Sequence, residues 1–371
     1  MLYILNTTKR VNNFSYSSML AAQSLGIEFH IAGNWTGYAD HSEILADEKK
    51  YGIKIHQVDF IRSPYDPRNL KAYKQIVSII KKEKFDIIHC NTPIGGLIGR
   101  IAGKRCGVKR IIYQAHGFHF FKGAPLKNWL IYYPIEKILA HFTDLLITIN
   151  KEDYELAKRK IHAKKVCYVP GVGIDLEKIQ NVQCNRNEVR KTMGVPEDCL
   201  LLLSIGELNV NKNHQVVVKA LAKLNNKNVH YAVAGIGYQK KKLLSLAKEL
   251  GVENQFHLLG FRTDALKLYK AADIFVFPSY REGLSISVME AMASGLPVVC
   301  SNIRGNIDLV ENKVGGFQFT PKDELTLATQ LTSLINSETK RKEMGQTNVH
   351  AIKAFSIENV LKKMEVIYKD I

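Results

Sequence analysis

The sequence predicts an α/β protein with two domains, each built around a parallel sheet. Short apolar runs alternate with helical stretches along the whole chain, which is the pattern of successive βαβ units. Some of these runs, such as residues 274–277, are apolar at every position, as strands buried on both faces are. The 371 residues, 46% of them hydrophobic, suffice for two domains of ordinary size.

The first half of the chain contains seven apolar runs that we expect to be strands. The loop after the first of them, residues 6–15, is polar and lacks the G-x-G-x-x-G pattern, which argues against a nicotinamide-dependent enzyme. Pro93 follows the fourth run and favours a helix start there. The expected strands are residues 2–5, 28–32, 53–60, 85–90, 110–114, 145–149 and 165–169.

The loop at residues 114–123 combines two histidines with three phenylalanines directly after a strand. A single histidine is more often structural than functional, but a place at the carboxyl end of a strand favours a role in ligand binding for His116. His119 either contacts a bound ligand or packs with the phenylalanines. Those phenylalanines form either core or an apolar platform for a lipid-linked ligand.

We expect the first domain to span residues 1–180 and the second to span residues 181–355, with a polar hinge near residues 177–198. The second domain has its own apolar runs, and one of them, from Tyr231, ends in G-x-G at Gly235 and Gly237. We expect helices at residues 322–336 and 339–355, and a final helix at residues 356–371 that crosses back to the first domain. The expected strands are residues 200–206, 231–237, 257–260, 274–277 and 296–300.

Residues 278–299 contain the strongest pattern in the chain. A turn at Glu282 and Gly283 follows a buried strand, Ser285 can cap the helix that comes next, and Gly295 ends that helix. Unpaired amides at the helix N-terminus favour a phosphate, and carboxylates accept hydrogen bonds from sugar hydroxyls. Two glutamates at this spacing, here Glu282 and Glu290, are usually ordinary helix residues. Their place within strand–turn–helix–strand favours a nucleotide-sugar site instead.

This stretch resembles the E-x7-E signature of the retaining glycosyltransferases of family 4, in the subfamily that makes capsules and exopolysaccharides. The resemblance implies the GT-B fold, in which two Rossmann-like domains face each other across a cleft. It also implies that Glu282 contacts the donor sugar and that Glu290 holds the ribose hydroxyls. The amides of Gly283, Leu284 and Ser285 would bind the diphosphate. Relatives often have glycine where this chain has Ser285.

Other segments match the family residue by residue. His116 matches a histidine that touches the donor sugar, and Lys212 matches a lysine that binds the diphosphate, so we expect both to act in catalysis with Glu282. The arginine usual before this lysine is Glu207 here, and Asn211, Arg281 or Arg304 would compensate. The resemblance also places near the nucleotide a set of glycines and strand-end residues: Gly206, Gly235, Gly237, Phe261 and Arg262.

The composition favours an anionic partner, because the net charge is +17 and the isoelectric point is about 9.4. No nucleic-acid motif occurs, so we expect no nucleic-acid partner. Residues 62–110 hold twelve Lys or Arg against three acids, which indicates either a solvated helix face or contact with anionic lipid. The scattered cysteines and the lack of a leader or an 18-residue apolar run predict a cytoplasmic protein, peripheral at most on the inner face of the cell membrane.

These observations predict a retaining hexosyl- or N-acetylhexosaminyltransferase. The donor would be a nucleoside-diphosphate sugar, UDP-linked, and the acceptor a glycan or a polyprenyl-diphosphate-linked glycan of a surface polysaccharide. No D-x-D motif adjoins a strand end, so we predict neither a metal nor a cofactor. The alternatives are a UDP-sugar 2-epimerase on the same fold and a non-enzymatic protein that binds anionic surfaces.

Overall fold

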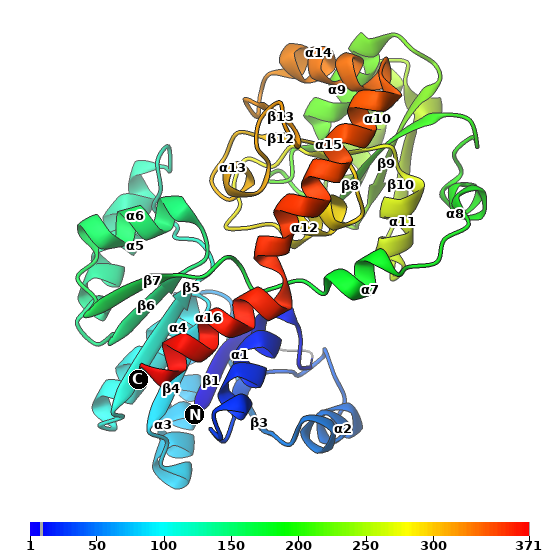
Figure 1. Ribbon diagram of the computed structural model, residues 1–371. Coiled ribbons are helices and arrows are strands. Elements are labelled where there is room, and N and C mark those ends of the chain that lie inside the picture. Colours follow the sequence, from blue (N-terminus) through cyan, green and yellow to red (C-terminus); the bar gives the residue numbers. More distant parts are fainter. Residues whose placement is uncertain (8–9, 371) are drawn as a thin grey trace. The chain divides into compact units, whose positions relative to one another are not determined.

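The computed structural model describes residues 1–7 and 10–370, and the chain divides into two compact units (Figure 1). Unit 1 consists of Met1–Gly173 with Ile357–Ile371, and unit 2 consists of Ile174–Ser356. We expected the boundary near residue 180. It lies earlier because the short helix α7 (Leu176–Gln180) buries Ile179 in the core of unit 2.

Unit 1 is built on a seven-stranded parallel sheet of order β3-β2-β1-β4-β5-β6-β7. Its strands are β1 (Leu2–Thr7), β2 (His30–Asn34), β3 (Lys54–Gln57), β4 (Ile87–Asn91), β5 (Arg110–Ala115), β6 (Leu145–Thr148) and β7 (Lys165–Tyr168). Its helices are α1 (Asn13–Ser24), α2 (His41–Tyr51), α3 (Asn69–Glu83), α4 (Pro93–Arg105), α5 (Leu126–Ala140), α6 (Lys151–Lys160) and α16 (Ile357–Lys369). All seven expected strands form. The third is four residues long, because Phe60 N turns back to Val58 O and leaves the ladder.

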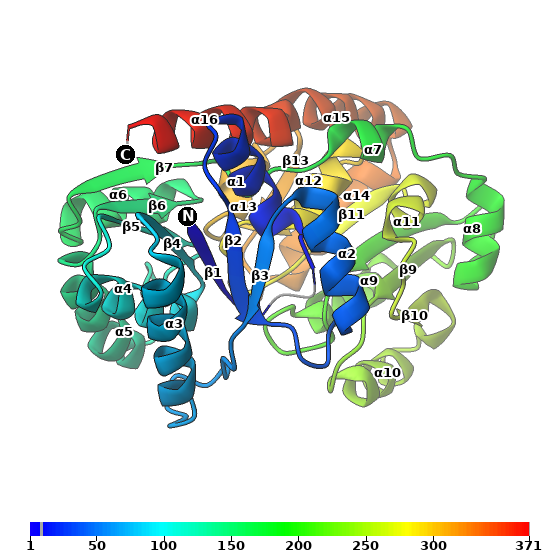
Figure 2. The ribbon, with the colours of Figure 1, turned by 90° about the horizontal axis from the view of Figure 1, so that it is seen from below.

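Helices cover both faces of this sheet (Figure 2). Helices α3, α4, α5 and α6 share one apolar core with the sheet, and α1 and α16 share the other. The C-terminal helix α16 joins unit 1 because it buries Val360 and Met364 there, and the hydroxyl of Tyr368 lies 2.7 Å from Nδ1 of His89 on β4. The expected final helix therefore forms, and it packs on the first sheet.

Unit 2 repeats the plan with a six-stranded parallel sheet of order β10-β9-β8-β11-β12-β13. Its strands are β8 (Leu200–Ile205), β9 (Val229–Ala234), β10 (Phe256–Gly260), β11 (Ile274–Phe277), β12 (Val298–Ser301) and β13 (Gly316–Phe319). Its remaining helices are α8 (Arg186–Met193), α9 (His214–Leu224), α10 (Lys240–Glu249), α11 (Ala265–Ala271), α12 (Ile286–Ala293), α13 (Asn306–Leu309), α14 (Glu324–Ile335) and α15 (Glu338–Ala351), with short 3-10 turns at Glu253–Gln255 and Ile352–Phe355.

The edge strand β13 was not expected from the sequence. It is four residues long and begins at a glycine, so no apolar run announces it. Across the residues that the structure describes, no helix combines the length and the apolar character needed to cross a bilayer.

Candidate active site

The candidate site of unit 2 lies at the carboxyl ends of β8 and β11. These strands are neighbours, but the chain leaves them toward opposite edges of the sheet, which makes this the topological switch point. Open parallel sheets bind ligands at such a point, because the two following loops diverge there. The loop after β8 and the loop after β11 are joined directly, since Tyr280 N donates to Asn211 O at 2.8 Å and Asn211 Nδ2 donates to Arg281 O at 3.0 Å.

Two of the residues expected to act in catalysis meet at this point. Lys212 Nζ lies 2.8 Å from Glu282 Oε1, and each side chain is about one-fifth exposed. The lysine also lies over the ring of Phe277, with Nζ 4.7 Å from the ring centroid. The aromatic face and the carboxylate hold the ammonium group in one place while leaving it accessible to a ligand.

Helix α12 begins beside this ion pair and directs its N-terminus to the same end of the sheet. Ser285 is its N-cap, as expected, and accepts a hydrogen bond from Val288 N. Within the described chain, no hydrogen bond occupies the amides of Gly283, Leu284 and Ser285. Three open donors at the positive end of a helix dipole form an anion site. Gly295, with φ +81°, follows the helix as expected.

A second loop supports the turn before α12. Arg304 is buried, and its Nε donates to the carbonyl of Glu282 at 3.1 Å. Gly305 has φ +81°, and a Cβ at this position would lie 2.2 Å from Gly283 O. Arg304 therefore positions the turn, and Gly305 is required by close backbone contact. Sequence reasoning considered Arg304 only as a phosphate ligand and missed Gly305, whose role depends on a contact across 22 residues.

Glu290 lies on the second turn of α12 and is partly buried. Burial is the main cause that raises the pKa of its carboxyl group above the usual range, and the Tyr269 hydroxyl, which donates to Oε2 at 3.1 Å, opposes this shift. A carboxylate has about four lone-pair positions, so one donor leaves it able to accept more hydrogen bonds. Tyr269 on α11 was missed by sequence reasoning, because nothing in its helix marks it as a partner of Glu290.

Three glycines expected near a nucleotide, Gly206, Gly235 and Gly237, lie where the loops after β8 and β9 approach each other closely. A Cβ on Gly235 would lie 1.9 Å from Gly206 O, and a Cβ on Gly237 would lie 2.4 Å from Leu208 O. Gly235 N also donates to Gly260 O at 2.8 Å, which brings the end of β10 to the same place. Close backbone contact therefore requires glycine at positions 235 and 237.

Phe261 and Arg262 follow β10 directly. The Phe261 side chain is 71% exposed, and the Arg262 guanidinium is bound by Asp264, with Nη2 2.7 Å from Oδ2. This pairing raises the pKa of Arg262. Asp264 precedes α11 at the N-cap position, but its carboxylate binds Arg262 and makes no cap hydrogen bond.

The possible substitutes for the usual arginine differ in their surroundings. Glu207 stands at the expected position and is exposed, where it accepts a hydrogen bond from Asn209 Nδ2 at 2.9 Å. Asn211 Nδ2 binds the carbonyl of Arg281, and Arg304 Nε binds the carbonyl of Glu282. Both side chains therefore already hold loops in place. Arg281 is exposed.

In unit 1, the expected residue His116 directly follows the end of β5. Its Nε2 is 3.0 Å from Asn91 Oδ1, which also accepts from the Tyr3 hydroxyl at 3.2 Å. Burial lowers the pKa of His116 to about 4, so the ring is neutral near pH 7. Because Asn91 Oδ1 is an acceptor, Nε2 carries the proton. Nδ1, buried and without a partner among the described residues, is an open acceptor.

Asn91 and Thr92 were missed as individual site residues. Asn91 ends β4 at the switch point of the first sheet, beside β1, and orients His116. Thr92 has φ +64° and ψ 158°, a conformation that costs of order 1–3 kcal/mol for a residue with a side chain. Strain of this kind often marks a ligand site, but no sequence pattern announces it before Pro93.

Two of the three phenylalanines near His116, Phe118 and Phe120, belong to the core. Phe118 and Phe120 are buried and stack on each other with centroids 4.8 Å apart. The buried Asp153 accepts from Phe118 N at 3.0 Å and fixes the loop. The His119 ring packs against the Tyr132 ring at a tilt, with centroids 4.6 Å apart. The structure therefore supports core packing, not an exposed apolar platform, for Phe118 and Phe120.

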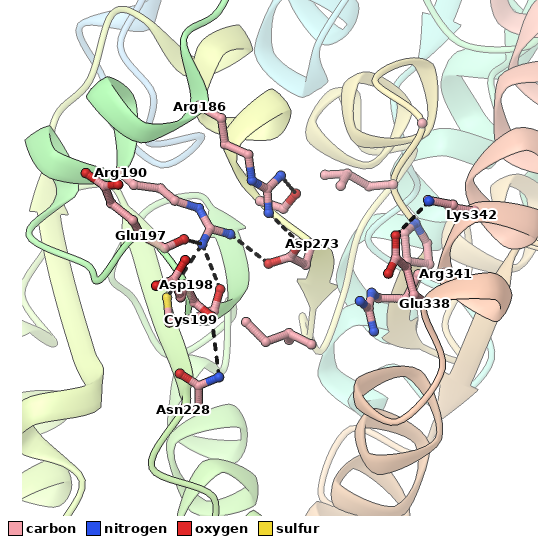
Figure 3. Close-up of a pocket in the computed structure, with 15 residues that line it drawn as sticks. Arg186, Arg190, Glu197, Asp198, Cys199, Asn228, Asp273, Glu338, Arg341 and Lys342 are labelled. Carbon is pink, nitrogen blue, oxygen red and sulfur yellow. Dashed lines mark hydrogen bonds and ion pairs between the residues drawn. The ribbon is translucent and has the colours of Figure 1, made fainter.

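The opposite end of the second sheet carries a cavity of about 600 Å³ (Figure 3). Arg186 and Arg190 converge there on Asp273, with N–O distances of 2.5 and 2.8 Å. Arg190 also donates to the carbonyls of Glu197 and Cys199. These charges are satisfied by one another and by backbone, so we assign the cavity a structural role. No group of metal-binding side chains was found in the described residues.

Comparison with known proteins defines the class first. The solved structure of HepE from Anabaena, in complex with UDP and glucose, matches with a TM-score of 0.80 at 18% identity, covering 100% of this chain and 99% of that one. The fold is therefore the GT-B fold of glycosyltransferases.

Sequence comparison then defines the family. The family "Glycosyl transferases group 1" matches residues 185–350, and "Glycosyl transferase 4-like" matches residues 20–150. The putative glycosyltransferase EpsD of Bacillus subtilis is 34% identical over 361 residues, 93% of this chain and 90% of that protein. An Escherichia coli UDP-Gal:alpha-D-GlcNAc-diphosphoundecaprenol alpha-1,3-galactosyltransferase is 27% identical over 311 residues, 82% and 80% of the two chains. The chain belongs to the group 1 family, also called family 4, and is a glycosyltransferase.

Proposed function

We propose that this glycosyltransferase moves a hexosyl or N-acetylhexosaminyl group from a UDP-sugar to a lipid-linked glycan during synthesis of a surface polysaccharide, with retention of anomeric configuration. The observation that carries the proposal is the Lys212–Glu282 contact of 2.8 Å beside the open amides of residues 283–285. A cation and a helix N-terminus at one point suit a diphosphate. The E. coli relative is named for a UDP-sugar donor and a diphosphoundecaprenol-linked acceptor, and the HepE structure holds UDP.

In the proposed complex, the diphosphate takes Lys212 away from Glu282. The lysine and the amides of Gly283, Leu284 and Ser285 then oppose the charge that develops on the leaving group. The Glu282 carboxylate, released from its ion pair, accepts hydrogen bonds from the donor sugar. Glu290 accepts hydrogen bonds from the ribose hydroxyls. Tyr269, its one side-chain partner among the described residues, leaves room for them.

The transfer breaks the bond between the anomeric carbon and the diphosphate oxygen and forms one to the acceptor oxygen on the same face of the sugar. The acceptor proton passes to the leaving phosphate, so no glycosyl-enzyme forms. His116 accepts a hydrogen bond from a sugar hydroxyl at Nδ1, which is the open acceptor of its neutral ring. Lysine and helix amides do the work of a metal ion, so transfer proceeds without one.

A nucleotide-sugar screen by thermal shift tests the donor. A bound UDP-sugar at 100 times its dissociation constant stabilises the protein by about 2.7 kcal/mol. Transfer to a polyprenyl-diphosphate-linked acceptor, followed by NMR of the new linkage, then tests configuration. An inverted product contradicts retention, and loss of activity in excess chelator contradicts metal independence. An epimerised donor in the absence of acceptor would indicate a 2-epimerase instead.

A further inference from the structure

Helix α5 of unit 1 is apolar on the side that the rest of the unit does not cover. Its inner side faces the core through Trp129, Tyr132 and Leu139. Its outer side carries five exposed large apolar residues: Leu126, Leu130, Ile131, Ile135 and Ile138. A helix that is apolar all round is normally buried on all sides. The outer side of α5 is apolar but exposed, so we expect it to contact another surface.

The spacing places these five side chains on one half of the helix circumference. They recur at steps of four, one, four and three residues, which keeps them on one side at 3.6 residues per turn. Leu126, Leu130 and Ile138 are 72, 68 and 61% exposed. Scattered exposed leucines need no explanation, but five on one helix face form a contiguous patch of the kind that marks an interaction site.

The exposed charges of α5 and of its neighbour α4 have one sign. The outer side of α5 adds Lys127 and Lys137, and the only acid of the helix, Glu136, turns inward to Arg100 at 2.8 Å. The adjacent helix α4, on the same face of the sheet, contributes exposed Ile101, Lys104 and Arg105 and has no acid. We call Leu126, Leu130, Ile131, Ile135 and Ile138 with Lys127 and Lys137 the α5 outer face.

We propose that the α5 outer face binds the surface of an anionic lipid bilayer. Apolar side chains enter the boundary between headgroups and acyl chains, and the lysines meet anionic headgroups, which is how interfacial helices bind. A protein partner would equally cover the apolar residues, but the absence of any acid on the exposed sides of α4 and α5 favours a uniformly anionic surface. This inference rests on the proposed function, because a membrane surface would bring unit 1 to a lipid-linked acceptor.

Sedimentation with vesicles tests the proposal on the full-length protein. The vesicles are phosphatidylcholine alone or phosphatidylcholine with about one-third phosphatidylglycerol. The triple variant Leu126→Gln, Leu130→Gln and Ile138→Gln should bind anionic vesicles about 100-fold more weakly than wild type. The matched control replaces three exposed aliphatic residues of other helices by glutamine. They are Leu45, Leu325 and Val366, at least half exposed, and this variant should bind as wild type does.

A second variant separates charge from apolar contact. Lys127→Gln with Lys137→Gln should weaken binding to anionic vesicles by about 10- to 30-fold, and added salt should weaken wild-type binding in the same direction. Unchanged binding in the apolar triple variant overturns the proposal. An equal loss of vesicle binding in the control variant also overturns it. So does a wild-type protein that binds no vesicles but forms a dimer that the triple variant cannot form.

The outcome is independent of catalysis. Both α5 variants should keep the thermal shift with UDP and the wild-type rate on a water-soluble acceptor, because none of their residues lies at the candidate site. If wild type fails to bind any nucleotide sugar but still binds anionic vesicles through this face, the proposed function fails and the surface assignment stands. The reverse result leaves the transferase and removes the membrane surface.

Discussion

At the residue scale, Lys212 is the side chain on which leaving-group stabilisation depends most. Lys212→Met should lower kcat by about 10²- to 10³-fold, as the loss of one preorganised donor at an anion does. The control is Lys219→Met on α9, whose Nζ lies 3.9 Å from Glu324 in an exposed pair that contributes little. Steady-state kinetics with the donor found by the screen decide the point. Equal rates for the two variants would contradict the role of Lys212.

Glu290 should reveal a conflict between stability and ligand binding. Its folded-state pKa is raised, so ionisation penalises folding above that pKa, and the penalty fades as pH falls toward the unfolded value near 4.5. Glu290→Gln should therefore stabilise the ligand-free protein at pH 7 and not near pH 4, since its amide oxygen still accepts from Tyr269. UDP should bind about 10- to 100-fold more weakly, because a charged acceptor is lost.

The comparison for that experiment is Glu338→Gln. Glu338 is exposed, and its hydrogen bond with Lys342 lowers its pKa, which is the opposite direction. This variant should gain no stability at pH 7 and should bind UDP as wild type does. Thermal unfolding at several pH values, with and without UDP, measures both effects. A Glu290→Gln protein that is less stable at pH 7 would contradict the burial argument.

At the element scale, helix α4 packs unusually close to the first sheet through its glycines. A Cβ on Gly96 would lie 2.4 Å from the Tyr113 ring. The Arg100 guanidinium also packs over this ring, 3.8 Å from its centroid. Gly96→Ala should cost about 1–3 kcal/mol of unfolding free energy through overpacking. Gly95→Ala should cost much less, because its nearest neighbour is the Thr92 hydroxyl at 3.1 Å and alanine favours helix. Urea unfolding of the two variants tests this difference in stability. Equal losses would mean that α4 can shift outward to make room for the alanine.

Elements were predictable where one local signal decides them. The strand at residues 274–277 is bounded by a charged residue and a proline, and the helix after it has a cap and a terminating glycine, so each formed as expected. The strand β13 lacks such a signal.

Site residues were likewise predictable only where a local motif marks them. Glu282 and Lys212 lie in recognisable motifs, whereas Asn91, Tyr269 and Gly305 take their roles from contacts that only the strand order creates.

At the scale of the whole molecule, buried neutral histidines should make unit 1 sensitive to acid. Burial lowers the pKa of His89 to about 3 and that of His116 to about 4. Between these values and about 6.5, the unfolded chain binds protons that the folded unit does not, so stability falls as pH falls. Each histidine contributes up to about 1.4 kcal/mol per pH unit in that window. Together, His89 and His116 should make the unfolding free energy depend on pH about twice as steeply as one histidine does.

Fluorescence isolates this effect, because both tryptophans, Trp35 and Trp129, belong to unit 1. Urea unfolding followed by tryptophan emission at pH 6 and pH 5 therefore reports unit 1 alone. His116→Gln keeps a donor for Asn91 and removes one titrating ring, so its stability should depend less steeply on pH, by about 1.4 kcal/mol per unit. The carboxylates titrate alike in both proteins and cancel in the comparison. Parallel pH dependences would mean that folding does not lower the pKa of His116, which would contradict the burial argument.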